Sequence, residues 1–277
     1  MSAARLPYSN AEQANALLRE RYLAKLDIQQ LSAITEGERN GVLSGLFLPT
    51  VADAYLDSPV RVMLIGQEPR SWGVSMHALA NGELTPTALD TYVRAQMKAY
   101  RGEAAKARPG QHVFLQFRKQ LRTALRPFLA PGADSIHWGN LLCVSLNGRT
   151  ATKASQLASI RILSKQLLAI QLEILQPDLV VFASGPNYDT FLKDQIDNRY
   201  KGLDGFKPRE FWPIQIEAPP CLGWRVRHPR ALTRATRAEL IGALRACASA
   251  LAVARAGTVA EEPLLPADAD PAHVVEF

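Results

Sequence analysis

Continuous apolar runs alternate with helical patterns along most of this chain. Three runs end at a polar residue or glycine, at 58–66, 140–148 and 177–186. Further strands are expected at 211–218 and 223–230. Apolar positions recur at helical spacing over 10–32, 111–129, 152–176 and 233–255. Uninterrupted apolar strands between helices indicate a parallel sheet covered on both faces, so we expect an α/β protein: a three-layer α/β/α sandwich with a mainly parallel four-stranded sheet.

The pattern divides the chain into three parts. Residues 1–50 are expected to be a helical segment packed on the core, with a second amphipathic stretch at 33–48. Residues 51–255 form the α/β domain, with a polar insert at 74–109 that carries a short helix near 87–100. Residues 256–277 contain five acidic residues and no Lys or Arg, and we expect this tail to be disordered because it buries too little apolar surface.

Charge and cysteine content narrow the class of protein. The net charge is +6 although the tail is acidic, so the rest of the chain is more basic than the whole. Such a balance favours a polyanionic partner, and a basic solvated surface is the alternative. The chain has no apolar run long enough for a membrane span and no pattern of a signal peptide. Its three cysteines lie far apart, which predicts a reduced, cytoplasmic protein without a metal site.

The candidate chemistry lies at the ends of the apolar runs. Parallel α/β sheets bind ligands outside the carboxyl ends of their strands. Glu68 follows the first run, Asn147 ends the second, and His228 follows the last. A carboxylate can stabilise a sugar cation and orient water, while a histidine can stabilise a departing anion. An Asn amide can bond a pyrimidine edge through both its donor and its acceptor.

The four run ends "GQEPRSWG", "WGNLLCVSLNGR", "VVFASGPNYD" and "WRVRHPRAL" together resemble the uracil-DNA glycosylase superfamily over residues 58–245. The first resembles its water-activating loop, with Glu68 in the place of the acid. The second keeps the interval of nine positions between Trp138 and Asn147, the place of the base-reading asparagine. The last resembles the histidine loop, with His228 and Leu232 in place. Glu68 instead of Asp, and Arg230 instead of Ser, put this chain in a divergent branch.

This resemblance implies roles for further residues. Substrate contacts are expected from Gly66, Gln67, Pro69, Arg70 and Trp72. DNA contacts are expected from Ser184, Gly185, Arg149, Arg225, Arg227, Arg230, Leu232 and Arg234, where Leu232 would fill the vacated base stack. Classical members close the pocket with a Tyr where this chain has Arg70, which favours a bulkier base. One branch of the superfamily removes glucosylated hydroxymethylcytosine from phage DNA.

The sequence thus predicts a monomeric, monofunctional DNA glycosylase that acts on a flipped non-canonical base without a cofactor or metal. Alternatives remain for single residues: Glu68 as a surface acid, Asn147 as a turn residue before Gly148, His228 as a core or phosphate-binding residue, and Leu232 as helix packing. Two other functions also remain open. The chain could be a non-catalytic nucleic-acid-binding module, or an enzyme acting on a small phosphate ester or nucleotide through the "SGPN" turn.

Overall fold

A mixed sheet forms the centre of the computed structural model, which describes residues 8–69, 75–82, 84–106, 113–196, 198–200, 209–217 and 220–259. The strands are β1 (Val62–Gly66), β2 (Ile136–Asn140), β3 (Leu179–Phe182), β4 (Asn198–Tyr200), β5 (Phe211–Glu217) and β6 (Pro220–Val226). Their order in the sheet is β2-β1-β3-β6-β5-β4. The first four in this order pair in parallel, and β5 and β4 pair antiparallel.

The α/β class is therefore confirmed, but the expected strand count and one strand position are wrong. The sheet has six strands in the described chain rather than four. The second strand lies at Ile136–Asn140, not at 140–148. Residues 141–146 are buried, but the strand register with β1 ends at the pair Gly66 and Asn140. Backbone hydrogen bonds from Leu141 to Gly66 and from Leu142 to Gln67 follow outside the strands.

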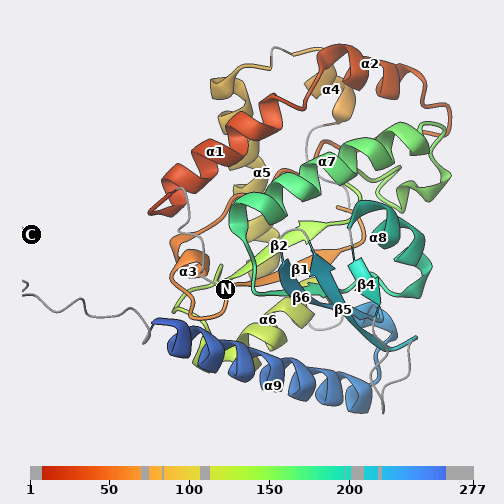
Figure 1. The fold of residues 1–277 in the computed structure, drawn as a ribbon. Coiled ribbons are helices and arrows are strands. Elements are labelled where there is room, and N and C mark those ends of the chain that lie inside the picture. Colours follow the sequence, from red (N-terminus) through yellow and green to blue (C-terminus); the bar gives the residue numbers. More distant parts are fainter. Residues whose placement is uncertain are drawn as a thin grey trace, which may run out of the picture.

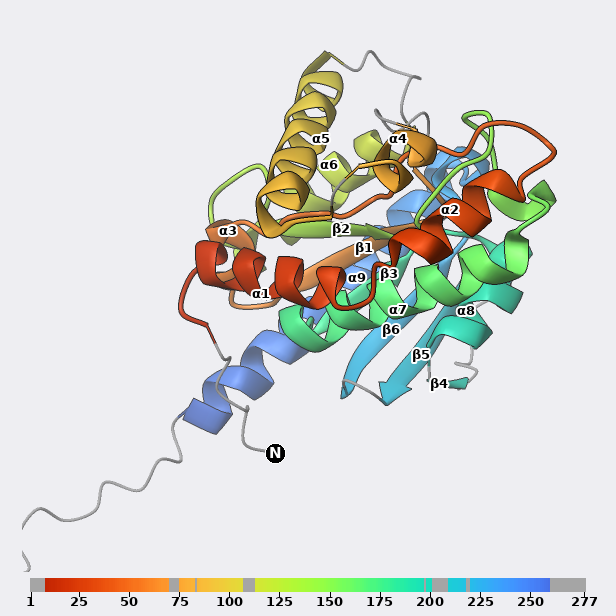
Figure 2. The same cartoon turned by 90° about the horizontal axis from the view of Figure 1, so that it is seen from above.

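Helices cover both faces of the sheet (Figures 1 and 2). They are α1 (Ala11–Leu23), α2 (Ile28–Glu36), α3 (Asp53–Leu56), α4 (Met76–Ala80), α5 (Pro86–Lys106), α6 (Val113–Leu125), α7 (Leu157–Leu175), α8 (Asp189–Gln195) and α9 (Arg234–Val259). Short 3-10 turns are η1 (Arg126–Phe128), η2 (Ala151–Lys153), η3 (Pro186–Tyr188) and η4 (Pro229–Ala231). Alternate residues of β1 pack into two different cores. Met63 and Ile65 pack into the core shared with α1 and α7, whereas Val62 and Leu64 pack into the core shared with α6 and α9.

The N-terminal segment packs on the domain as two helices rather than one. The expected helix at 10–32 is interrupted because Asp27 caps α2, accepting a hydrogen bond from the backbone N–H of Gln29. Residues 33–48 are helical only to Glu36. Tyr8 donates a 2.6 Å hydrogen bond to the carbonyl of Ile174 at the end of α7.

The insert at 74–109 contains α4 and α5 in the part that the structure describes. Helix α5 runs from Pro86 to Lys106, longer than the expected helix at 87–100. Asp90 of α5 pairs with Arg19 of α1 at 2.9 Å, so the insert packs on the N-terminal helices. At the other end of the chain, α9 reaches Val259, past its expected end at 255, and residues 260–277 of the acidic tail lie outside the described residues.

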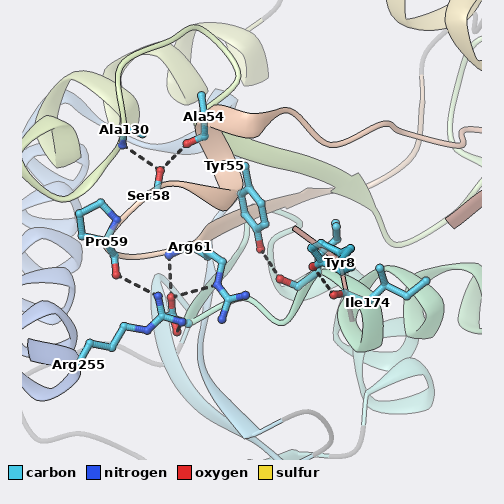
Figure 3. A network of polar contacts seen from close by, with 11 residues as sticks. Tyr8, Ala54, Tyr55, Ser58, Pro59, Arg61, Ala130, Ile174 and Arg255 are labelled. Atoms are coloured by element: carbon cyan, nitrogen blue, oxygen red, sulfur yellow. Dashed lines mark hydrogen bonds and ion pairs between the residues drawn. The ribbon is translucent and has the colours of Figure 1, made fainter. Parts of the chain in front are cut away.

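The amino ends of β1 and β3 are joined by an ionic network (Figure 3). Asp178, just before β3, accepts a 2.7 Å hydrogen bond from the backbone N–H of Arg61, just before β1. Arg255 of α9 pairs with the same carboxylate at 2.9 Å and donates to the carbonyl of Pro59. Nearby, Tyr55 of α3 donates to the carbonyl of Leu175 at 3.2 Å. The network fixes the sheet end that lies opposite the candidate site.

Candidate active site

Three loops meet at the carboxyl edge of the parallel strands. They follow β1, β3 and β6, whose ends are aligned by the pairs Ile65–Phe182 and Phe182–Arg225. Gln67, in the first loop, donates a 2.7 Å hydrogen bond from Nε2 to the backbone carbonyl of Ser184 in the second. The sequence-predicted loops after β1 and β3 are therefore in direct contact.

Glu68 is tied to this edge by a tyrosine that the sequence analysis did not single out. The hydroxyl of Tyr188 donates a short hydrogen bond to Oε2 of Glu68, and it lies 2.5 Å from the hydroxyl of Thr150. Burial, and then the neighbouring Glu68 carboxylate, raise the pKa of Tyr188. The phenol therefore stays protonated and serves as a donor to the half-buried carboxylate.

His228 is brought to the same edge by close packing against Gly185. Gly185 has φ +74°, and a Cβ there would lie 3.1 Å from the backbone nitrogen of His228. Its own N–H donates to the carbonyl of Val226 at 3.0 Å. Nδ1 of His228 accepts a 3.2 Å hydrogen bond from the backbone N–H of Arg230. A neutral ring with Nδ1 as acceptor carries its proton on Nε2, which makes this nitrogen a donor.

Replacing Gly185 with Ala is expected to destabilise the fold by about 1–2 kcal/mol or more, because a Cβ is strained at positive φ and crowds the His228 backbone. Urea denaturation would measure the change. Gly242 of α9 provides the matched control, since a Cβ there meets nothing within 4 Å. Gly242→Ala should stabilise the helix by about 0.5–1 kcal/mol. Equal effects of the two substitutions would contradict the role given to Gly185.

Asn147 lies in a turn and its amide is engaged elsewhere. Asn147 and Gly148 have φ of 51° and 66°, and Leu146 and Arg149 exchange backbone hydrogen bonds across them, as in a type I′ hairpin turn. Oδ1 of Asn147 accepts from the backbone N–H of Val42 at 2.9 Å, and Nδ2 donates to the carbonyl of Asn40 at 3.1 Å. These contacts favour the turn interpretation that the sequence left open. Thr150, close by in sequence, reaches Tyr188 at the carboxyl edge, whereas the Asn147 amide contacts the backbone of Asn40 and Val42.

Asn140, which the sequence analysis missed, holds the position beside the Glu68 loop. It is the last residue of β2 and pairs with Gly66, the last residue of β1. Asn140 is 6% exposed, and its Nδ2 has no hydrogen-bond partner among the described residues. A Cβ on Gly66 would lie 2.5 Å from Oδ1 of Asn140 and 3.1 Å from the ring of Phe114. Only a glycine therefore leaves room for this amide. The sequence does show Asn140 as a polar residue next to an apolar run. It was not recognised as a strand end because the second strand was expected at 140–148 instead of 136–140.

The expected DNA-contacting residues fall into two groups. Arg149, Arg227, Arg230 and Arg234 are exposed and can reach a polyanion. Arg225 is 2% exposed and forms a paired contact with Asp189, Nε to Oδ1 at 2.9 Å and Nη2 to Oδ2 at 3.2 Å. Leu232 is also buried, in the core shared with α6 and α9. Arg225 is therefore unsuited to phosphate binding, and Leu232 packs as a core residue in this structure.

The remaining substrate-contact predictions have different outcomes. Pro69 is buried and Gln67 is half-buried; Ser184, which was expected to contact DNA, is also buried. Arg70 and Trp72 lie outside the described residues, so the expected bulky-base pocket stays a prediction.

Comparison with known proteins adds no family. No protein-family model matches the chain, and a search of curated proteins found no match. Among the described residues, no helix is long and apolar enough to cross a membrane, and no group of three or more His, Cys, Asp or Glu residues could hold a metal ion.

Proposed function

We propose that this chain is a DNA glycosylase that hydrolyses the bond between a flipped base and its sugar. The observation that carries the proposal is the half-buried Glu68 carboxylate, held by Tyr188 at the carboxyl edge of parallel strands. A half-buried acid held in this way at a strand end suits chemistry better than surface solvation. The resemblance of the run ends to the uracil-DNA glycosylase superfamily supports the same reaction.

In the proposed reaction, the bond between C1′ and the base nitrogen breaks and its electron pair leaves with the base. The Glu68 carboxylate stabilises the positive charge that develops on the sugar. A water oxygen forms the new bond to C1′ and gives a proton to Glu68. The Nε2–H of His228 stabilises the departing base anion, which then takes a proton from solvent.

Asn140 is the proposed base-reading residue, in place of Asn147, for which the family resemblance implied this role. Among the described residues the buried Nδ2 of Asn140 has no hydrogen-bond partner, so a base carbonyl that accepts from it would satisfy a costly unpaired donor. The half-buried ring of Phe114 lies beside the same glycine and offers an apolar face to a base. The base is uracil or a bulky modified cytosine such as glucosylated hydroxymethylcytosine.

Incubation with matched DNAs tests the proposal. The DNAs carry uracil, hydroxymethylcytosine or glucosylated hydroxymethylcytosine, and released bases are identified by mass spectrometry. Release of one base by the wild type, and not by Glu68→Gln, is the expected result. DNA binding without release from any of them would favour the non-catalytic module, and no binding at all would favour a small phosphate-bearing substrate.

DNA binding is expected to weaken with salt in proportion to the number of phosphates held. If the four exposed arginines Arg149, Arg227, Arg230 and Arg234 each hold one, log K should fall with log[salt] at a slope of about −3 to −4. Arg230→Ala should reduce the magnitude of this slope by about 1. Arg21→Ala is the control, because Arg21 pairs with Glu173 on α7. Fluorescence anisotropy titrations measure both, and a slope unchanged by Arg230→Ala would remove Arg230 from the interface.

A further inference from the structure

We propose that Tyr188 is a positioning residue for Glu68, and that the Asp189–Arg225 ion pair holds Tyr188 in place. The kinetic part of this inference rests on the proposed glycosylase function. Its structural part concerns the coupling between the phenol and the carboxylate. The Asp189–Arg225 ion pair, which is not part of the hydrogen bonding of the sheet, thereby has a role in positioning Tyr188.

The phenol of Tyr188 connects two loops at the carboxyl edge. Its ring is buried, at 5% exposure, and packs on Phe191 with ring centroids 5.3 Å apart. Its hydroxyl touches Oε2 of Glu68 on one side and the Thr150 hydroxyl on the other. If Tyr188 gives its one proton to Glu68, it accepts from Thr150, so the three groups form a directed chain that ends on the carboxylate. Such a chain fixes the orientation of Glu68 before a substrate binds.

The ion pair beside Tyr188 restrains the start of α8. Asp189 follows Tyr188 directly and is the first residue of α8. Arg225 of β6 contacts the Asp189 carboxylate through two nitrogens. Its guanidinium carbon lies 5.4 Å from the ring centre of Trp212, and it donates a 3.2 Å hydrogen bond to the carbonyl of Arg209. A two-point contact of this kind constrains direction as well as distance. Tyr188 is thereby anchored to the sheet one residue away from its contact with Glu68.

The coupling has a consequence for proton binding. A donor to the charged form of a carboxylate favours that form, so removing the Tyr188 hydroxyl should move the titration of Glu68 to higher pH. Other charged or titratable groups on the described elements around this site do not change in that variant. They are Arg149, Asp189, Lys193, Arg225, Arg227, His228 and Arg230.

The experiment compares Tyr188→Phe with Tyr55→Phe in the full chain. Tyr55 is the matched control, because it also loses a buried hydroxyl that donates one hydrogen bond, but at the opposite end of the sheet (Figure 3). The titration of Glu68 is followed by carbon-13 NMR of glutamate-labelled protein, with Glu68→Gln assigning the signal. Single-turnover base release and DNA affinity are measured in parallel as a function of pH.

Tyr188→Phe is expected to shift the Glu68 titration to higher pH, to slow base release about 10-fold or more, and to move the acidic limb of the rate profile in the same direction. DNA affinity should stay unchanged, and Tyr55→Phe should alter none of these readouts. Asp189→Asn should reproduce part of the shift, since it loosens the anchor of Tyr188 while the phenol hydroxyl itself is retained.

An unmoved Glu68 titration in Tyr188→Phe would overturn the inference, whatever the activity. An equal shift in Tyr55→Phe would do the same, because it would point to a general loss of structure. A shift confined to Tyr188→Phe in a protein that releases no base would sustain the coupling and remove the proposed function, so the two failures are distinguishable.

Discussion

Replacing Glu68 with Gln is expected to slow base release at least about 100-fold while leaving DNA affinity within about twofold. The amide keeps the size of the side chain and can still accept from Tyr188, whose hydroxyl lies on Oε2 of Glu68 in the wild type. What it lacks is the negative charge that stabilises the sugar cation and the base that takes the proton from water. The loss should therefore appear in the chemical step and not in binding.

Single-turnover kinetics with saturating enzyme isolate that step, and anisotropy titrations report the affinity. Glu173→Gln serves as the control, because Glu173 is an exposed acid that pairs with Arg21 on the surface. It should release base at the wild-type rate. If Glu68→Gln were equally active, Glu68 would have no part in the reaction, and the binding-module and small-substrate hypotheses would gain.

Replacing Asp189 with Ala is expected to lower the free energy of unfolding by about 3–5 kcal/mol. The substitution leaves the guanidinium of Arg225, 2% exposed, without the carboxylate that neutralises it. Burying a charge without its partner costs far more than the pair contributed, because the solvation lost on folding is no longer offset. Weakening of the fold should come with slower base release, since Tyr188 loses its anchor.

Urea denaturation measures the loss of stability, and Glu173→Ala again supplies the comparison. The side chains of the Arg21–Glu173 pair are 44% and 62% exposed, so breaking it should cost about 0–1 kcal/mol. A similar small cost for Asp189→Ala would mean that Arg225 is satisfied by other acceptors, such as the carbonyl of Arg209.

The hydrophobic pattern predicted the strands that are buried on both faces. It did not predict the strand boundaries that depend on pairing with a neighbouring strand. The run that contains β1 ends at Gly66, where the structure ends the strand, because a fully buried strand needs apolar residues at every position. The run at 140–148 gave a wrong strand position, since its residues 141–146 are buried without continuing the strand. Buried coil and buried strand have the same composition, so only the partner distinguishes them.

The antiparallel pairing of β5 and β6 could have been recognised from the short connection between them. Glu217 and Pro220 are paired ends of β5 and β6, and so short a connection cannot cross over to a parallel strand. The break between α1 and α2 was also visible in principle, because Asp27 is a favoured N-cap residue. Both signals are local and were outweighed by the longer apolar periodicity.

The candidate site was predictable where it depends on strand ends and unpredictable where it depends on contacts between loops. Glu68 and His228 lie in the loops after β1 and β6, as the order of apolar runs indicated. Tyr188 and Asn140 emerge only once β3 and β2 are placed on either side of β1. Arg225 was expected to contact DNA, but strand alternation turns its side chain inward, towards Asp189 and Trp212.

The network of Arg61, Asp178 and Arg255 also bears on the order in which the chain is completed during synthesis. Its members are far apart in sequence, and Arg255 lies near the end of the last described helix. On the ribosome, Asp178 can meet Arg61 once β3 has emerged, but Arg255 follows only after α9 has been made. The network at the sheet end opposite the site is therefore completed only after α9 has emerged. Until then, the core face that α9 covers is exposed to solvent and to chaperones.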